Sequence, residues 1–276
     1  MKIAVVTDST AYLPAAVASG VTVVPLHVVL GDHSGLEGSE ISPSDVAAAL
    51  EARSPVTTSR PTPRSFTRAY ADAVAAGATG IVSVHLSETL SSTIDAARIA
   101  AAVTEVPVEV VDSRGVGMAI GFAVLAAAHA GAQGLQAAAE AARRTAAETA
   151  TFFSVETLEH LRRGGRITAR QAILGTALSV KPILHVVDGS IELLEKVRTT
   201  SRAMVHLEDR VAQSAGERMV DIAVHHLRQE DRAQGLADRL RERIPGLREL
   251  YLAEVGAVVA AHTGPGLLGV VVAPAL

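Results

Sequence analysis

Residues 81–100 read IVSVHLSETLSSTIDAARIA. The apolar alternation from Ile81 to Leu86 predicts a strand, and the apolar spacing from Ile94 to Ile99 predicts a helix. The turn between them is crowded with hydroxyls: Ser87, Thr89, Ser91, Ser92 and Thr93. A strand that leads into a helix start presents free backbone N–H groups and the positive end of a helix dipole, so this turn predicts an anion site. A simple helix cap by Ser91 or Ser92 explains the same residues equally well.

Short apolar strands alternate with helical segments outward from this stretch in both directions, which predicts an α/β fold with largely parallel sheets. The sequence Asp188-Gly189 between two apolar runs predicts an added antiparallel hairpin in the second half. This change suggests two α/β domains, residues 1–155 and 156–276. The polar segment 161–168, LRRGGRIT, is expected to be a hinge, lid or connecting loop. One strand is expected over residues 21–30, and helices over 14–18 and 169–176.

Composition limits the function classes. Hydrophobic residues make up 49% of the 276 residues, enough for a sizeable core. The net charge of −4 without a basic block argues against nucleic acid as a partner, and the 3% of aromatic residues offers little surface for stacking bases. The absence of cysteine fits a reducing compartment. The N-terminus lacks a signal-peptide pattern and glycines interrupt the apolar run 116–130, so we expect a cytoplasmic protein without stable membrane insertion.

Polar residues follow several predicted strands, where open α/β sheets bind their ligands. Asp8 and Asp112 stand at strand ends, and an ordinary cap or turn explains them better than a ligand does. Thr58 lies in a proline-rich loop. His262 precedes the rigid Gly264-Pro265-Gly266 loop and is equally well explained as a structural histidine. No metal-ligand spacing, P-loop or dinucleotide-binding glycine pattern is present in the sequence.

A hydrolase is the competing chemistry. Ser91, His262 and Asp112 could form a nucleophile, base and acid set. No serine stands in the G-x-S-x-G elbow that such enzymes place on a strand-to-helix turn. Covalent catalysis therefore ranks below ligand binding.

The segments form an ordered pattern along the chain. They are VTDST at 6–10, VVPLHV at 23–28, TTSRPTPRSF at 57–66, SETLSSTIDAA at 87–97, VDS at 111–113, LRRGGRI at 161–167, SVKPIL at 179–184 and HTGPGLLGV at 262–270. In order and spacing they resemble the DegV family, also called the fatty-acid-binding EDD family, over essentially the whole chain.

That resemblance implies a non-catalytic protein that holds one long-chain fatty acid near the domain junction, with no other cofactor. It implies that Thr58 and Ser91, with the neighbouring Ser92, grip the carboxylate. The family's C-terminal histidine corresponds to His262, and its arginine after the hairpin strand to Arg198. Some members carry the acid as a subunit of bacterial fatty-acid kinase and present it to a separate ATP-binding partner.

Two positions depart from the family pattern. Ser92 replaces a glycine, which would strain the turn if a positive φ were needed there and would cost little in a first helical turn. Arg60 stands where many members have glutamine. Two further functions stay open: a Ser91/His262-dependent hydrolase or acyltransferase, and a lipid sensor that needs no kinase.

Overall fold

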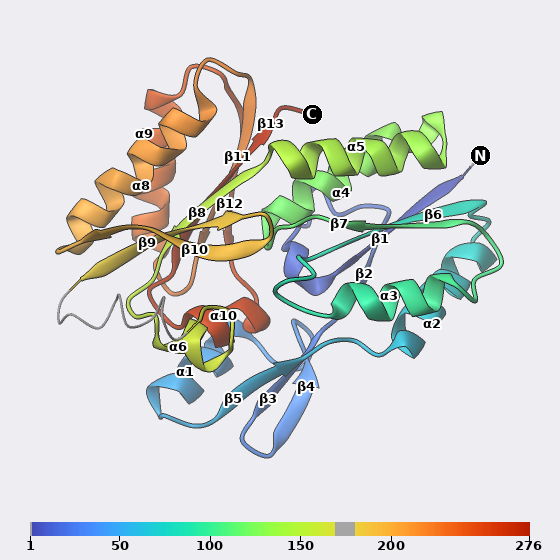
Figure 1. Cartoon of the computed structure of the whole chain (residues 1–276), viewed down its shortest axis with the longest axis horizontal. Helices are drawn as coiled ribbons and strands as arrows, with labels where there is room; N and C mark the ends of the chain where they lie inside the picture. Colours follow the sequence, from blue (N-terminus) through green and yellow to red (C-terminus); the bar gives the residue numbers. More distant parts are fainter. Residues whose placement is uncertain (1, 169–179) are drawn as a thin grey trace.

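Three sheets make up the fold in the computed structural model, which describes residues 2–168 and 180–276 (Figure 1). The first sheet is parallel throughout, in the order β2 (Val21–Val24), β1 (Ile3–Asp8), β6 (Gly80–His85) and β7 (Val108–Asp112). Helices α4 (Met118–Ala130) and α5 (Leu135–Glu148) cover one face, and α2 (Pro63–Ala75) and α3 (Thr93–Ala101) cover the other. Short 3-10 turns follow β1 and α4, as η1 (Ser9–Ala11) and η2 (Gly131–Gln133). This half confirms the predicted α/β fold with a parallel sheet.

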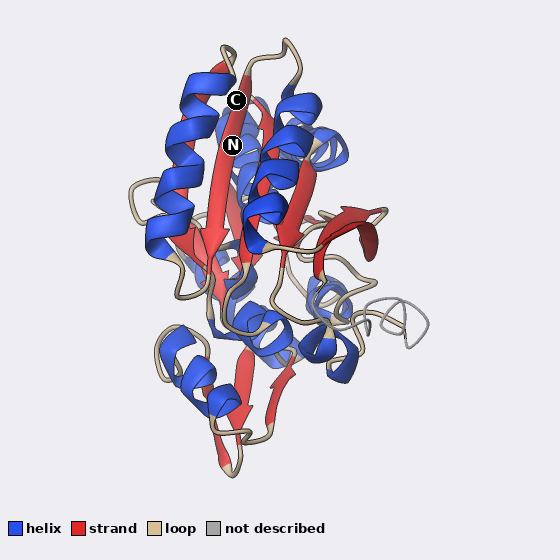
Figure 2. Cartoon of the chain, turned by 90° about the vertical axis from the view of Figure 1, so that its left-hand side faces the viewer, coloured by secondary structure: helices blue, strands red, loops and turns tan. Residues whose placement is uncertain are grey.

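The second sheet has six strands within the described residues. Its order is β10 (Ser190–Val197), β9 (Lys181–Val187), β8 (Ala150–Ser154), β13 (Leu268–Pro274), β11 (Val220–His226) and β12 (Leu247–Glu254). Helices α8 (Thr200–Ala215) and α9 (Glu230–Arg243) pack on this sheet, on the side that faces the viewer in Figure 2. Helices α4 and α5 also contact β13, so these two helices lie between the sheets. The domain division at residue 155 stays a prediction, although β8 already belongs to this second sheet.

The expectation of largely parallel strands holds for the first sheet only. In the second sheet β11 and β12 are parallel, and the other neighbours are antiparallel. The reason lies in α10 (Ala257–Thr263), which separates β12 from β13. This helix packs on α1 (Pro43–Glu51), α6 (Glu159–Arg163) and β5 (Val56–Ser59). Because this helix lies at the end of the sheet and not across its face, the chain returns from the end at which it left, and β13 runs antiparallel to β11.

The predicted hairpin is confirmed. Asp188 and Gly189 adopt φ values of 47° and 82°, the left-handed pair that a two-residue hairpin turn requires. The turn reaches across to the first sheet, where Ser87 Oγ donates a 2.8 Å hydrogen bond to the Gly189 carbonyl. The hairpin therefore fixes the two sheets to one another.

A small third sheet contains β4 (His33–Leu36), β3 (His27–Leu30) and β5 (Val56–Ser59), with α1 (Pro43–Glu51) beside it and α6 (Glu159–Arg163) nearby (Figure 1). It divides the expected strand 21–30 in two. Pro25 has no N–H to donate, so pairing stops there and the chain leaves the first sheet for the third. Residues 14–18 make one turn on the Pro14 carbonyl instead of a helix, and the helix expected over 169–176 lies outside the described residues.

The buried carboxylate of Glu37 joins the third sheet to the rest. Its Oε1 accepts hydrogen bonds from the Val258 amide at 2.8 Å and from the Tyr12 hydroxyl at 3.1 Å, and its Oε2 accepts one from the Ser9 hydroxyl. Tyr12 in turn accepts from the Val259 amide at 3.2 Å. The carboxylate therefore ties the start of α10 to the segment after β1. Burial is the main reason that the pKa of Glu37 is raised.

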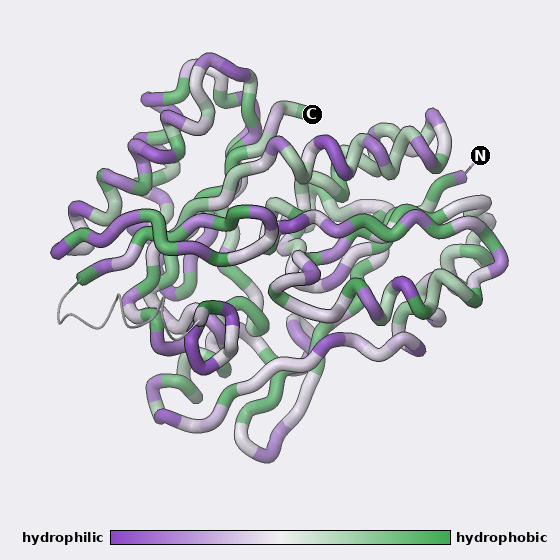
Figure 3. The backbone as a smooth tube through the Cα atoms, viewed as in Figure 1, coloured by the Kyte–Doolittle hydropathy of each residue, from purple (hydrophilic) through white to green (hydrophobic). Residues whose placement is uncertain are grey.

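Apolar residues predominate along the central strands, and polar residues alternate with apolar ones along α8 and α9 (Figure 3). The apolar residues of these two helices pack in one core with β11 and β13. One apolar cluster lies between α4 and the second sheet and includes Met118, Phe122 and Val271. Among residues 2–168 and 180–276, no helix combines the length and apolar character needed to cross a membrane.

Replacing Gly189 with alanine tests how much the contact between the hairpin turn and the first sheet contributes to the free energy of unfolding, apart from the strain of the turn itself. A Cβ at this position would collide with Ser87 Oγ in addition to occupying a positive φ. Gly20→Ala is the matched control, because its φ is 79° and no atom lies within 4 Å of the added Cβ. We expect Gly189→Ala to lower the free energy of unfolding by about 1 kcal/mol more than the control in urea titrations. Equal losses would show that the hairpin contact adds no stability.

Candidate functional site

A cavity of about 110 Å³ lies where the three sheets meet. Most of its lining is apolar: Leu26, Leu86, Leu90, Val116, Phe153, Leu161, Ile191, Val255, Val258, Val259, Leu267, Val270 and Val271. Its polar lining residues are Thr10, Thr58, Ser59, Arg60, Ser91, Thr151, Arg166, His225, His262 and Thr263. The lining comes from both sides of residue 155, where we predict the domain boundary. It is a mainly apolar space into which a few hydroxyl, imidazole and guanidinium groups project.

Thr58 and His262 form a hydrogen-bonded pair in this lining. Their Oγ1 and Nε2 atoms are 2.9 Å apart, although 204 residues separate them in sequence. Thr58 is held in β5, opposite Val28 of β3, and His262 lies in the last turn of α10. Burial, and then the charge of Arg166, lower the pKa of His262 to about 3, so the imidazole is neutral near pH 7. Its buried Nδ1 has no hydrogen-bond partner among the described residues.

Arg166 is the site residue that the sequence pattern did not reveal. It follows α6 in the segment expected to be a hinge, lid or loop, and its half-buried side chain lines the cavity. Its guanidinium donates to the Gly164 carbonyl, and no carboxylate within the described part of the chain pairs with it. Burial lowers its pKa from the ordinary arginine value. A half-buried cation without a carboxylate partner favours an anionic ligand nearby.

The residues of the hydroxyl-rich turn after β6 make different contacts. Ser87 and Thr89 contact the hairpin, whereas half-buried Ser91 lines the cavity. Ser91 Oγ lies 2.9 Å from Thr93 Oγ1 and accepts a long, 3.3 Å hydrogen bond from the Thr93 amide at the start of α3. Ser91 therefore bonds the first amide of α3 and also lines the cavity, whereas Ser92 holds the N-cap position without a side-chain cap hydrogen bond. The role of Ser91 as an anion ligand stays a prediction.

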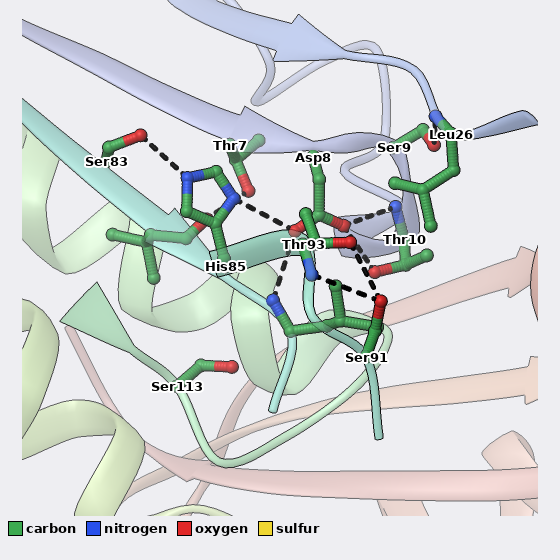
Figure 4. A network of polar contacts seen from close by, with 12 residues as sticks. Thr7, Asp8, Ser9, Thr10, Leu26, Ser83, His85, Ser91, Thr93 and Ser113 are labelled. Carbon is green, nitrogen blue, oxygen red and sulfur yellow. Dashed lines mark hydrogen bonds and ion pairs between the residues drawn. The ribbon is translucent and has the colours of Figure 1, made fainter. Parts of the chain in front are cut away.

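A buried network around Asp8 holds this turn in place (Figure 4). Asp8 Oδ2 accepts from the Leu86 amide and contacts His85 Nδ1, each at 3.0 Å, while Oδ1 accepts from the Thr10 amide. His85 Nε2 lies 2.7 Å from Ser83 Oγ. Asp8 thus caps η1, as the ordinary interpretation expected, and also fixes the end of β6 from which Ser91 is presented.

Two predicted ligands do not line the cavity. Ser92 is exposed, and its φ of −80° shows that this position needs no glycine. Its carbonyl accepts a 3.2 Å hydrogen bond from Arg60. Arg198 is exposed just beyond β10, because the last strand residue, Val197, is the one that turns into the core.

The proposed hydrolase set is not assembled. His262 Nε2 contacts Thr58 and not Ser91, and the Nδ1 that an acid would orient has no partner among residues 2–168 and 180–276. Asp112 instead accepts a 2.8 Å hydrogen bond from the Arg114 amide. It acts as the turn former that the ordinary interpretation expected.

The fold and the cavity define a class of α/β protein that encloses an apolar space, with hydroxyls, a neutral imidazole and a half-buried guanidinium in its wall. A DegV family model matches residues 2–275. A DegV domain-containing protein of Streptomyces coelicolor is 56% identical over 274 residues, covering 98% of each chain. The chain belongs to the DegV family.

Two solved structures cover all of this chain and are themselves covered completely. A DegV family protein from Thermus thermophilus, described by its fatty-acid binding, has a TM-score of 0.94 at 33% identity. DegV of Bacillus subtilis, described as a fatty-acid-binding protein, has a TM-score of 0.89 at 30% identity.

The neutral state of His262 predicts a pH-dependent stability. The unfolded chain binds a proton at this imidazole below about pH 6.5, whereas the folded protein binds it only near pH 3, so stability should fall as the pH falls through this window. His262→Gln should flatten the loss by about 1 kcal/mol between pH 6 and 5 in denaturant titrations. Exposed His129→Gln serves as the control. Parallel pH profiles for wild type and His262→Gln would contradict the buried neutral state.

Proposed function

We propose that this protein binds one long-chain fatty acid, with the acyl chain in the apolar cavity and the carboxylate at Thr58, Ser91, His262 and Arg166. The observation that carries the proposal is the lining itself: thirteen aliphatic or aromatic side chains enclose the space, and a hydroxyl–imidazole pair lies beside a half-buried arginine with no carboxylate partner among the described residues. The fatty-acid binding described for the Thermus and Bacillus relatives supports the same ligand class.

The acyl chain supplies most of the affinity. Burying about 15 methylenes at about 0.8 kcal/mol each gives an upper bound near 12 kcal/mol before the costs of ordering the ligand. Small branched residues such as Val258 and Val270 suit this role because they make a narrow space without polar atoms. The polar residues mainly fix which end of the lipid lies where.

The carboxylate needs donors and a countercharge, because an unpaired buried charge is costly. Thr58 and Ser91 supply hydroxyl donors, and Arg166 supplies the positive charge. His262 stays neutral, so it can donate one ring N–H to an oxygen and accept the Thr58 hydroxyl at the other nitrogen.

We further infer that the bound acid is presented to a separate ATP-binding kinase. Ser59 and Arg60 line the cavity beside Thr58 and are exposed, so the polar part of the lining continues to the surface. Much of the apolar lining, including Val258, Val270 and Val271, is buried. A carboxylate near that surface is accessible to a partner while the acyl chain remains covered.

The double variant Thr58→Val, Ser91→Ala should lose its lipid. Removing both hydroxyls leaves carboxylate oxygens without donors, so we expect binding of palmitate to weaken by about 10- to 100-fold. Native mass spectrometry of the purified protein and a fluorescent fatty-acid displacement assay measure this change. Ser92→Ala is the control, because its exposed side chain makes no cap hydrogen bond. Retention of the fatty-acid adduct by the double variant at wild-type affinity would contradict the carboxylate site.

Presentation to a kinase has a chemical readout. With ATP and a candidate fatty-acid kinase present, the loaded protein should yield an acyl phosphate, which hydroxylamine traps as a hydroxamate detected by mass spectrometry. Arg166→Gln should lower this yield and also weaken lipid retention. Lipid binding without any hydroxamate from the kinases of the same genome would favour a sensor, and hydrolysis of an ester by the isolated protein would favour a hydrolase.

A further inference from the structure

A second cavity, of about 470 Å³, shares Thr58, Arg166 and His262 with the first. It lies between α1, β5, α6 and α10, and Arg53, Arg163 and His160 complete its basic lining. We propose that this basic cavity is a binding site for a phosphate dianion, and that it holds the phosphoryl group that is transferred to the fatty-acid carboxylate. This inference rests on the proposed function.

The described charged residues that line the cavity are all basic. Arg53, Arg163 and Arg166 line it, and no aspartate or glutamate is among its lining residues in the described part of the chain. The carboxylate nearest in sequence, Glu159, bonds Arg163 Nε at 2.8 Å and is also bridged by Arg162. Among residues 2–168 and 180–276 the Arg163 Nη groups have no hydrogen-bond acceptor, so the pair with Glu159 leaves them for a ligand. Guanidinium groups match phosphate oxygens by paired hydrogen bonds, so three of them around one space favour a phosphate over a single carboxylate.

Arg53 occupies a position where the backbone favours glycine. It follows the C-terminus of α1 with a φ of 58°, and the Ser54 amide donates to the Ala49 carbonyl in the pattern of a left-handed helix end. A side chain in this conformation costs stability relative to glycine. The arginine is nevertheless exposed, forms no ion pair within residues 2–168 and 180–276, and lines the cavity. The Arg53 charge therefore adds to the basic lining of the cavity, besides being favourably placed at the C-terminus of α1.

The shared wall places the two anions next to one another. Thr58, Arg166 and His262 face the first cavity, where the carboxylate is proposed, and also the second. In the transfer, a carboxylate oxygen attacks the terminal phosphorus of a nucleoside triphosphate bound by the partner. One O–P bond forms as the bond to the bridging oxygen breaks, and the nucleoside diphosphate leaves with that electron pair. The product is a mixed anhydride whose phosphoryl group would occupy the basic cavity while the acyl chain stays in the apolar one.

Inorganic phosphate and acetyl phosphate are the probes for this site. Each is titrated calorimetrically into the full-length protein, loaded with palmitate or lipid-free, and we expect binding that weakens roughly tenfold in Arg53→Gly and in Arg163→Gln. Arg53→Gly suits its backbone φ, so the fold should survive the change. Arg162→Gln is the matched control, since Arg162 also pairs with Glu159 but does not line the cavity.

Three outcomes decide the proposal. Selective loss in the two cavity variants, with the control unchanged, supports it. Equal phosphate affinity in all variants, or no binding of either probe at millimolar concentration, overturns it. Binding to phosphatidylglycerol vesicles that depends on Arg53, without binding of the soluble probes, also overturns it in favour of a lipid headgroup surface. Native mass spectrometry of the wild type tests fatty-acid binding separately, so failure of the proposed function is recognised independently of the phosphate titration.

Discussion

The buried carboxylate of Glu37 is the constraint on which the arrangement of the site depends. Helix α10 has seven residues, too few to be stable by its own hydrogen bonds, so its position must come from packing and from its ends. Glu37 accepts the Val258 amide at the start of this helix and two hydroxyls from the segment after β1. A single charge can be buried here because three donors satisfy it. The same bonds place His262, one turn further along α10, against Thr58 of β5.

The cavity exists because three sheets meet without a continuous core between them. Where α4 contacts the second sheet, Met118 and Phe122 pack densely with Val271. Near α10 the facing residues are mostly valines and leucines, which are too short to fill the space between β5, β8 and β13. The fold thus places a narrow apolar space beside polar groups. Hydrogen bonds from backbone amides to Asp8 on one side and to Glu37 on the other fix the positions of these polar groups. The two ends of the proposed lipid ligand would then be distinguished by chemistry and not by shape alone.

The sequence predicted those features of the fold and of the cavity that depend on local residue patterns. The strand–turn–helix pattern predicted a polar site at Ser91, and the Asp188-Gly189 pair predicted the hairpin. Both patterns lie within a few adjacent residues, which is why the sequence reveals them. It missed Arg166, since a Gly-Gly-Arg segment carries the same signal for an exposed loop as for a half-buried ligand. Arg198 and Ser92 were placed in the site by family pattern, yet the burial of Val197 and the start of α3 turn them outward. The antiparallel second sheet escaped prediction because strand–helix alternation does not say whether a helix such as α10 crosses the sheet or ends beside it.

Ser92 shows that the turn before α3 does not need a glycine at this position. With φ at −80°, the residue takes a conformation open to any side chain, and the contact that the backbone makes is a carbonyl accepting from Arg60. Arg60, where the family resemblance leads us to expect glutamine, is thus the partner of Ser92, where it leads us to expect glycine. The two changes together bring a cation to the rim of the cavity without altering Ser91 or Thr58. Because Arg60 also lines the cavity, a positive charge there adds to the field of Arg166, and the preference for an anionic end is distributed over two elements, β5 with its following loop and the loop after α6.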